Sequence, residues 1–115
     1  MPFKPLLSKP FNHSVRHLHR KYRQVKSDLE AAIEVLLQYP KLGMVIPGTS
    51  GVRKLRIPSS DMDKGKRGGF RLLYSLDTNK SLIVLLFVYA KPQRQDLSRK
   101  EIEAIVKEAL EDNVV

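Results

Sequence analysis

The sequence predicts an α+β fold: a small twisted antiparallel β-sheet with two N-terminal helices before it and one C-terminal helix after it. Apolar residues recur at helical spacing in the first third of the chain, alternate as in strands through the middle, and return to helical spacing near the end. A chain of 115 residues can bury one hydrophobic core but has no room for a second lobe. Residues 1–115 are therefore expected to form a single domain.

The first third reads as one extended segment and two helices. Residues 2–7 are expected to form a short strand or an arm, punctuated by Pro10. Ser27, three residues before Glu30, has the pattern of a capping box for a second helix that ends near Tyr39. If Ser27 caps, the two helices form a hairpin; if it does not, they are one bent helix. The apolar faces are Phe11, Val15, Leu18, Tyr22 and Val25, then Leu29, Ala32, Ile33, Leu36 and Leu37.

Three strands are expected in the middle of the chain. A turn cluster at residues 47–51 precedes an alternating segment at 52–57, and a second alternating segment covers 70–77. Residues 82–90 are apolar on both faces, which is typical of a buried central strand.

The connection between the last two strands sets which residues face each other. A two-residue turn at residues 78–79 would place Arg71 across from Leu86 and Arg67 across from Ala90. A second capping pattern, Ser98 with Glu101, then predicts a final helix. Its inner face is expected to be Ile102, Ile105, Val106 and Leu110.

Composition narrows the class of partner. The chain has 21 Lys and Arg against 12 Asp and Glu, a net charge of +9, which favours a nucleic-acid partner. It has no cysteine, which excludes disulfides, thiolate zinc sites and cysteine nucleophiles. No apolar run approaches the roughly 18 residues of a membrane span, so a soluble, cytosolic protein is expected.

Cations are concentrated on two of the expected strands. The alternation of residues 52–57 places Lys54 and Arg56 on one face and Arg53 on the other. The approach to the next strand reads KGKRGGFR at residues 64–71 and brings further cations toward the same sheet. This pattern indicates a binding site for polyanions.

Three runs, in this order, resemble the RelE/ParE toxin superfamily, and most closely its HigB-type, RelE-like branch: IPGTSGVRKLR at 46–56, KRGGFRLLY at 66–74, and LFVYAK at 86–91 with Asp96 and Leu97. The resemblance extends over nearly the whole chain. It implies the toxin of a type II toxin–antitoxin system, an mRNA interferase that cleaves mRNA in the ribosomal A site. It further implies a prokaryotic cytoplasmic protein, no cofactor or metal, and an antitoxin partner, expected to be a helix-turn-helix DNA-binding protein.

Cleavage of RNA without a metal requires a base for the 2′-hydroxyl, charge stabilisation at phosphorus and an acid for the leaving oxygen. Neighbouring cations would favour the neutral form of Lys54, a candidate base. Arg56 and Arg71 are candidates for stabilising the transition state. Arg67 or Lys91 would protonate the leaving group. Further RNA-binding candidates are Arg53, Lys66 and Arg94.

The sequence departs from the RelE branch at two positions. Where that branch carries a catalytic Arg and a Tyr, this chain has Pro92 and Ser98. The proton donor therefore stays open among Lys91, Arg94 and Tyr89, although Tyr89 is otherwise interpreted as a packing residue.

Two other functions remain open: a non-catalytic growth inhibitor of the same fold, such as a ParE-like gyrase poison, and an inactive RNA-binding module. The combination of Lys54, Arg56 and Arg71 favours the nuclease. The three histidines, His13, His17 and His19, are expected in the first helix, away from the cationic strands. The His13 and His17 pair is interpreted as a surface pair, since no third metal ligand accompanies it.

Overall fold

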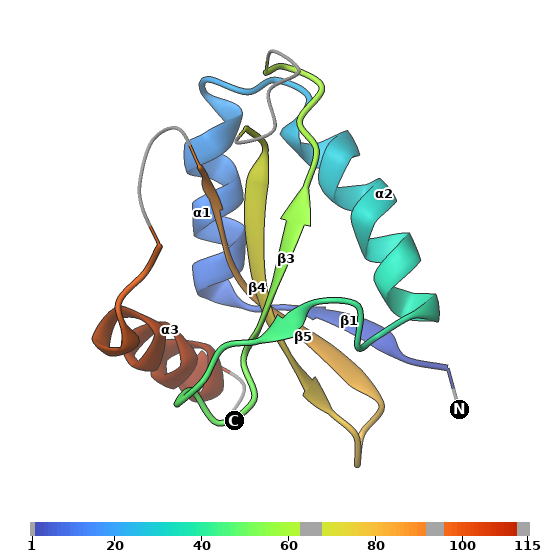
Figure 1. The fold of residues 1–115 in the computed structure, drawn as a ribbon, viewed down its shortest axis with the longest axis vertical. Coiled ribbons are helices and arrows are strands. Elements are labelled where there is room, and N and C mark those ends of the chain that lie inside the picture. The colour runs from blue at the N-terminus through green and yellow to red at the C-terminus, as the bar shows by residue number, and fades with distance from the viewer. Residues whose placement is uncertain (1, 63–67, 92–95, 113–115) are drawn as a thin grey trace.

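The computed structural model describes residues 2–62, 68–91 and 96–112. Its elements follow the order β1 (Lys4–Leu7), α1 (Lys9–His19), α2 (Val25–Gln38), β2 (Met44–Val45), β3 (Arg53–Ile57), β4 (Phe70–Asp77), β5 (Leu82–Ala90) and α3 (Arg99–Asp112). The predicted α+β fold is confirmed, with two helices before the main strands and one after them (Figure 1).

The strands form one sheet in the order β1-β5-β4-β3-β2. The pairs from β2 to β5 are antiparallel, as predicted, but β1 runs parallel to β5, so the sheet is mixed. β1 leads directly into α1, which continues beside β5. Two buried serines attach this helix to the strand: the Ser8 hydroxyl donates to the Leu85 carbonyl at 2.7 Å, and the Ser14 hydroxyl accepts from the Val88 amide at 3.1 Å.

The predicted register between β4 and β5 is wrong. Arg71 lies opposite Tyr89, and Ala90 lies opposite Phe70; Arg67 is outside the described residues. The turn is longer than two residues, because the chain leaves β4 after Asp77 and enters β5 at Leu82. A bulge also interrupts the pairing, since Leu73 faces Phe87 whereas Tyr74 faces Leu85.

The two faces of the sheet carry separate cores. One core joins α1 and α2 to the sheet through Phe11, Leu36, Phe70 and Tyr74, among others. The other core lies under α3 and includes Leu73, Tyr89 and Ile102. Figure 1 accordingly shows α2 and α3 on opposite sides of the sheet.

The helix starts only partly follow the capping predictions. The Ser98 box is confirmed: the Ser98 amide donates to Glu101 Oε1 at 2.9 Å, and the Glu101 amide donates to Ser98 Oγ at 3.2 Å. Ser27 does not cap, because α2 has already begun and its hydroxyl donates to the Gln24 carbonyl at 3.0 Å. Even so, α1 and α2 are two separate helices. The Gln24 amide instead donates to Asp61 Oδ2 at 2.7 Å, which joins the start of α2 to the segment after β3.

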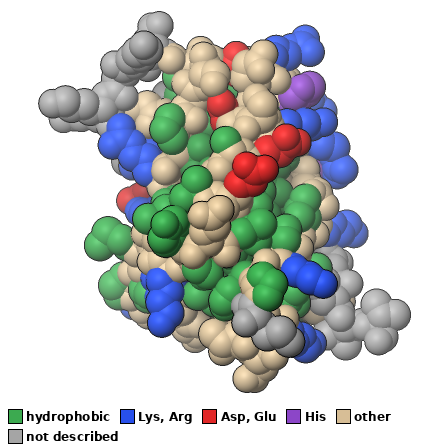
Figure 2. All heavy atoms as spheres, turned by 90° about the vertical axis from the view of Figure 1, so that its right-hand side faces the viewer, with side chains coloured by type: hydrophobic (Ala, Val, Ile, Leu, Met, Phe, Trp, Pro, Cys, Tyr) green, Lys and Arg blue, Asp and Glu red, His purple; other side chains and the backbone are tan. Residues whose placement is uncertain are grey.

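The face that carries α2 is largely apolar. Figure 2 looks onto it and shows hydrophobic side chains gathered in the middle, with most Lys and Arg side chains toward the rim. Exposed apolar residues occur at the end of α2 and in the segment after it, namely Val35, Tyr39, Leu42, Met44 and Val45. Lys54 and Arg56 of β3 and Arg71 of β4 lie on the other face of the sheet.

Candidate nucleic-acid interface

A row of polar side chains crosses the sheet on the face that also carries α3. Arg56 of β3 lies directly opposite Arg71 of β4, which in turn lies opposite Tyr89 of β5. Residues directly opposite one another on neighbouring strands share a face. Lys54, two residues before Arg56, therefore lies on this face as well. The predicted separation of Lys54 and Arg56 from Arg53 is confirmed.

The pairing of two arginines is unusual in its energetics. Like charges directly opposite one another on adjacent strands destabilise a sheet. Arg56 is exposed, whereas Arg71 is partly buried and donates to the carbonyls of Gly68 and Phe70, both at 3.3 Å. Two guanidinium-bearing residues at paired positions on neighbouring strands are a suitable arrangement for binding the oxygens of a phosphate.

Gly69 allows this pairing. Its φ of +90° lies in the region that favours glycine, and a Cβ built there would approach the Ile57 carbonyl oxygen to 2.5 Å. Any side chain at this position would push the start of β4 away from β3. Close approach of these two backbones places Arg71 opposite Arg56, so the need for glycine here is structural.

Asp96 joins three residues of the site. Its Oδ1 accepts from Lys54 Nζ at 3.2 Å, from the Tyr89 hydroxyl at 3.0 Å and from Lys91 Nζ at 3.5 Å. Lys54 and Tyr89 belong to β3 and β5, the strands on either side of β4. We call the sheet face that carries Lys54, Arg56, Arg71 and Lys91 the cationic face. The Asp96 carboxylate lies over β4, at the centre of this face.

The electrostatics at Asp96 are those of an exposed ion pair. Hydrogen bonds from Lys54 and then from Tyr89 hold the pKa of the Asp96 carboxyl below its usual range, against a smaller opposing effect of burial. The Asp96 side chain is 56% exposed and that of Lys54 is 34% exposed. Ion pairs this accessible to water contribute only about 0–1 kcal/mol. A phosphate can therefore displace Asp96 at little cost.

Sequence reasoning did not find the role of Asp96. It lies 42 residues from Lys54 in the chain, and the sequence drew attention to it only as part of a run that resembles a family. Tyr89 is a packing residue, as predicted, and it also makes a polar contact. It is 3% exposed and packs in the core under α3, while its hydroxyl donates to Asp96.

Not every sequence candidate lies on the cationic face. Arg53 points to the other side of the sheet, where its Nη1 donates to the Gly43 carbonyl at 2.7 Å and to the Lys41 carbonyl at 3.2 Å. These bonds hold the segment that leads into β2. Lys66, Arg67 and Arg94 fall outside the described residues. Lys54, Arg56, Arg71 and Lys91 are thus the candidates that the structure brings to one face.

The histidines are nearer to this face than expected. His13 and His17 line a groove of about 430 Å³ between α1 and β5, and Phe87 and Tyr89 line the same groove. They therefore share a groove with Tyr89, which contacts the cationic face through Asp96. His19 does not line this groove.

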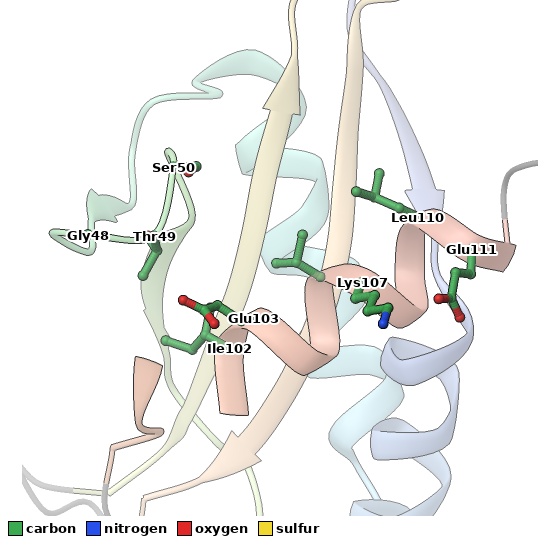
Figure 3. A pocket seen from close by; sticks show the side chains of 9 residues that line it. Gly48, Thr49, Ser50, Ile102, Glu103, Lys107, Leu110 and Glu111 are labelled. Atoms are coloured by element: carbon green, nitrogen blue, oxygen red, sulfur yellow. The ribbon is translucent and has the colours of Figure 1, made fainter. Parts of the chain in front are cut away.

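A second hollow, of about 630 Å³, has a different character. It lies between α3 and the turn before β3, and Figure 3 shows α3 side chains along one side and Thr49 on the other. Ile102, Val106 and Leu110 make it mainly apolar, and Lys107 is accompanied by acidic residues. It does not have the chemistry of a phosphate site.

The part of the chain that the structure describes contains neither a metal-binding cluster nor a membrane-spanning helix. Within it, no group of three or more His, Cys, Asp or Glu side chains is placed to hold a metal ion. Also within it, no helix has the length and apolar character needed to cross a membrane.

Comparison with known proteins identifies the fold. No family model matches the sequence. Among solved structures, the chain is similar to the Escherichia coli toxin RelE, determined in the free state as a mutant with two arginines replaced by alanine. The TM-score is 0.57 at 16% sequence identity, and the match covers 100% of both chains. The chain therefore has a RelE-like fold over its full length.

Proposed function

We propose that this chain is the toxin of a type II toxin–antitoxin pair and that it acts as a HigB-type endoribonuclease on mRNA in the ribosomal A site. The observation that carries the proposal is the Arg56 and Arg71 pair, with Lys54 on the same face of the sheet. The RelE-like fold supports it, because the neighbour of known structure is itself described as a toxin. The net charge of +9 is appropriate for a protein that approaches RNA.

The reaction is an internal transfer at phosphorus. The 2′-oxygen of the substrate forms a bond to the neighbouring phosphorus as its proton leaves, and the bond from phosphorus to the 5′-oxygen breaks. The products are a 2′,3′-cyclic phosphate and a 5′-hydroxyl. Arg56 and Arg71 bind the non-bridging oxygens, where negative charge increases in the transition state.

Lys54 is the proposed base and Lys91 the proposed acid. Lys54 can accept a proton only in its neutral form, which no longer makes an ion pair with Asp96. Before it acts as the base, Lys54 must therefore release its proton to solvent and separate from Asp96. Lys91 contacts the same carboxylate oxygen at 3.5 Å and can deliver a proton to the leaving 5′-oxygen. Asp96 positions both amines before RNA binds.

The proposal includes further RNA contacts and a protein partner. Lys66, Arg67 and Arg94 contribute additional positive charge along the RNA. Arg53 keeps its structural contacts to the segment before β2. The partner is an antitoxin, expected to be a helix-turn-helix protein, whose binding prevents the cationic face from reaching the ribosome.

Brief induction in bacteria, followed by mapping of RNA 5′ ends, tests this proposal. Translation should stop, and new ends should appear inside translated reading frames. Removing the start codon of a reporter message should abolish the cuts in that message. Cuts that persist without the start codon would reject the dependence on ribosomes. Damage to DNA without new RNA ends would instead identify a gyrase poison, and co-expression of the neighbouring antitoxin gene should restore growth.

A further inference from the structure

Two adjoining grooves on α1 share the side chains of His13 and His17. The first, of about 430 Å³, lies against β5 and includes Phe87 and Tyr89. The second, of about 560 Å³, is lined within the described residues by basic side chains, which besides the shared pair are Arg16, His19, Arg20 and Lys26. The volume of the first groove lies in the range of small-molecule sites.

The walls of the two grooves differ in chemistry. The groove against β5 offers an aromatic and apolar wall beneath two exposed imidazoles. Phe87 is only partly buried, and its ring lies 6.5 Å from that of Tyr89 at an angle of 36°. The other groove offers guanidinium, ammonium and imidazole groups. Among the residues that the structure describes, no acidic side chain lines either groove, and the first acidic residue in the chain is Asp28.

Single-stranded RNA is the ligand with matching chemistry. It is bound by aromatic side chains that stack on its bases and by cations that follow its phosphates. Imidazole nitrogens can also hydrogen-bond to base edges as donor or acceptor. A purely apolar peptide would leave the cationic groove unused, and an acidic peptide would leave the aromatic wall unused.

Tyr89 connects the groove to the cationic face. Tyr89 is one of the residues that line the groove, and its hydroxyl donates to Asp96, which also pairs with Lys54. A strand of RNA with one phosphate at Lys54 and Arg71 can therefore continue past Tyr89 into the groove. We propose that the α1–β5 groove is a subsite for a base of single-stranded RNA next to the cleaved nucleotide, with the Arg16 and Arg20 groove holding the phosphates that follow. This assignment rests on the proposed function.

Binding of a labelled 2′-O-methyl RNA hexamer, which lacks the attacking hydroxyl and stays intact, tests the subsite by fluorescence anisotropy. The combined His13→Ala and His17→Ala variant changes only exposed residues. Phe87→Leu keeps an apolar side chain but removes the aromatic ring. Each should weaken binding about 5- to 150-fold, which is the range for stacking one base on an aromatic side chain. Lys80→Ala, in the turn between β4 and β5, is the control for loss of a charge and should change affinity less than about twofold.

Hexamers with one abasic nucleotide distinguish a base subsite from a general positive field. The abasic nucleotide is placed at each position of the hexamer in turn. The parent protein should lose the most affinity when the missing base is at one particular position. Binding to Phe87→Leu should not depend on that position.

Three results would overturn the proposal. The first is an RNA affinity that is unchanged in both groove variants. The second is a loss of affinity for polyphosphate, which has no bases, that equals the loss for RNA in the same variant, and the third is a loss of antitoxin binding in variants that still bind RNA. The last result would identify a protein interface. A parent protein that binds RNA in this way but fails to cut mRNA on programmed ribosomes would contradict the nuclease assignment alone.

Discussion

Replacing Asp96 with Asn should strengthen the binding of RNA. The substitution keeps the shape of the side chain and removes one negative charge from the centre of the cationic face. In the parent protein the Asp96 carboxylate forms ion pairs with Lys54 Nζ, at 3.2 Å, and with Lys91 Nζ, at 3.5 Å. RNA must compete with it for both amines. The Asn variant should offer them to phosphate without that competition.

The size of the gain follows from the geometry. For a phosphate that replaces Asp96 at Lys54, we take a separation of the two negative charges on the order of 6 Å, roughly twice the 3.2 Å between Lys54 and Asp96. At that distance two unit charges repel by about 0.7 kcal/mol in water and about 3 kcal/mol at an effective dielectric constant near 20. Because the Asp96 side chain is 56% exposed, the value should be near the lower end. We expect about 1 kcal/mol, which is about a fivefold gain in affinity.

The assay is binding of uncleavable RNA at low salt, with Tyr89→Phe as the matched control. Tyr89→Phe removes the 3.0 Å hydrogen bond to Asp96 but leaves its charge, so it should not strengthen binding. An Asp96→Asn protein that binds RNA no better than the parent would refute the reasoning, because the phosphate would then lie elsewhere. Equal gains in both variants would show that mobility of the segment, and not charge, controls binding.

Three further predictions concern stability, each measured by denaturant unfolding. Gly69→Ala should cost at least about 2 kcal/mol, because it strains a backbone with φ of +90° and brings a Cβ against the Ile57 carbonyl; an unchanged unfolding midpoint would contradict this. Tyr74→Phe should cost about 1–3 kcal/mol, since it removes the buried hydroxyl that accepts from the Gly43 amide at 2.7 Å and donates to the Pro40 carbonyl at 2.8 Å. Tyr22→Phe should cost less, because the Tyr22 hydroxyl makes no hydrogen bond to the residues that the structure describes. Asp96→Asn should lower the free energy of unfolding by under about 1 kcal/mol at pH 7. Because folding lowers the pKa of Asp96, this loss should disappear as the pH falls below the ordinary Asp value of about 4. A loss that grows as the pH falls would contradict this prediction.

Local patterns were sufficient for much of the fold. The alternation in β3 correctly assigned Lys54 and Arg56 to one face and Arg53 to the other, because side-chain direction in a strand depends only on position along it. The box at Ser98 correctly marked the start of α3, because its two hydrogen bonds join residues three apart. Ser27 shows the limit of that method, since α2 begins earlier, where Asp61 accepts from the Gln24 amide.

Long-range contacts account for what the sequence did not reveal. Nothing in residues 4–7 marks parallel pairing with β5, which depends on how α1 packs beside that strand. The bulge in the β4–β5 pair and the longer turn changed the partner of Arg71 from Leu86 to Tyr89. The position of Asp96 over β4 likewise depends on two strands and a later segment together. The sequence therefore predicted some of the residues on the cationic face, but it did not predict that the Asp96 carboxylate lies at its centre.

Single-turnover cleavage of mRNA on programmed ribosomes, with saturating protein, tests the central claim most directly. Arg71→Ala should slow cleavage by about 100-fold or more, because the guanidinium stabilises charge that develops only in the transition state. Lys54→Ala should slow it by about 10²- to 10⁴-fold if Lys54 is the base. Lys80→Ala should cleave at the parental rate, and every variant should remain folded and bind antitoxin. Parental rates for both Arg71→Ala and Lys54→Ala would contradict the assignment of this face as the active site.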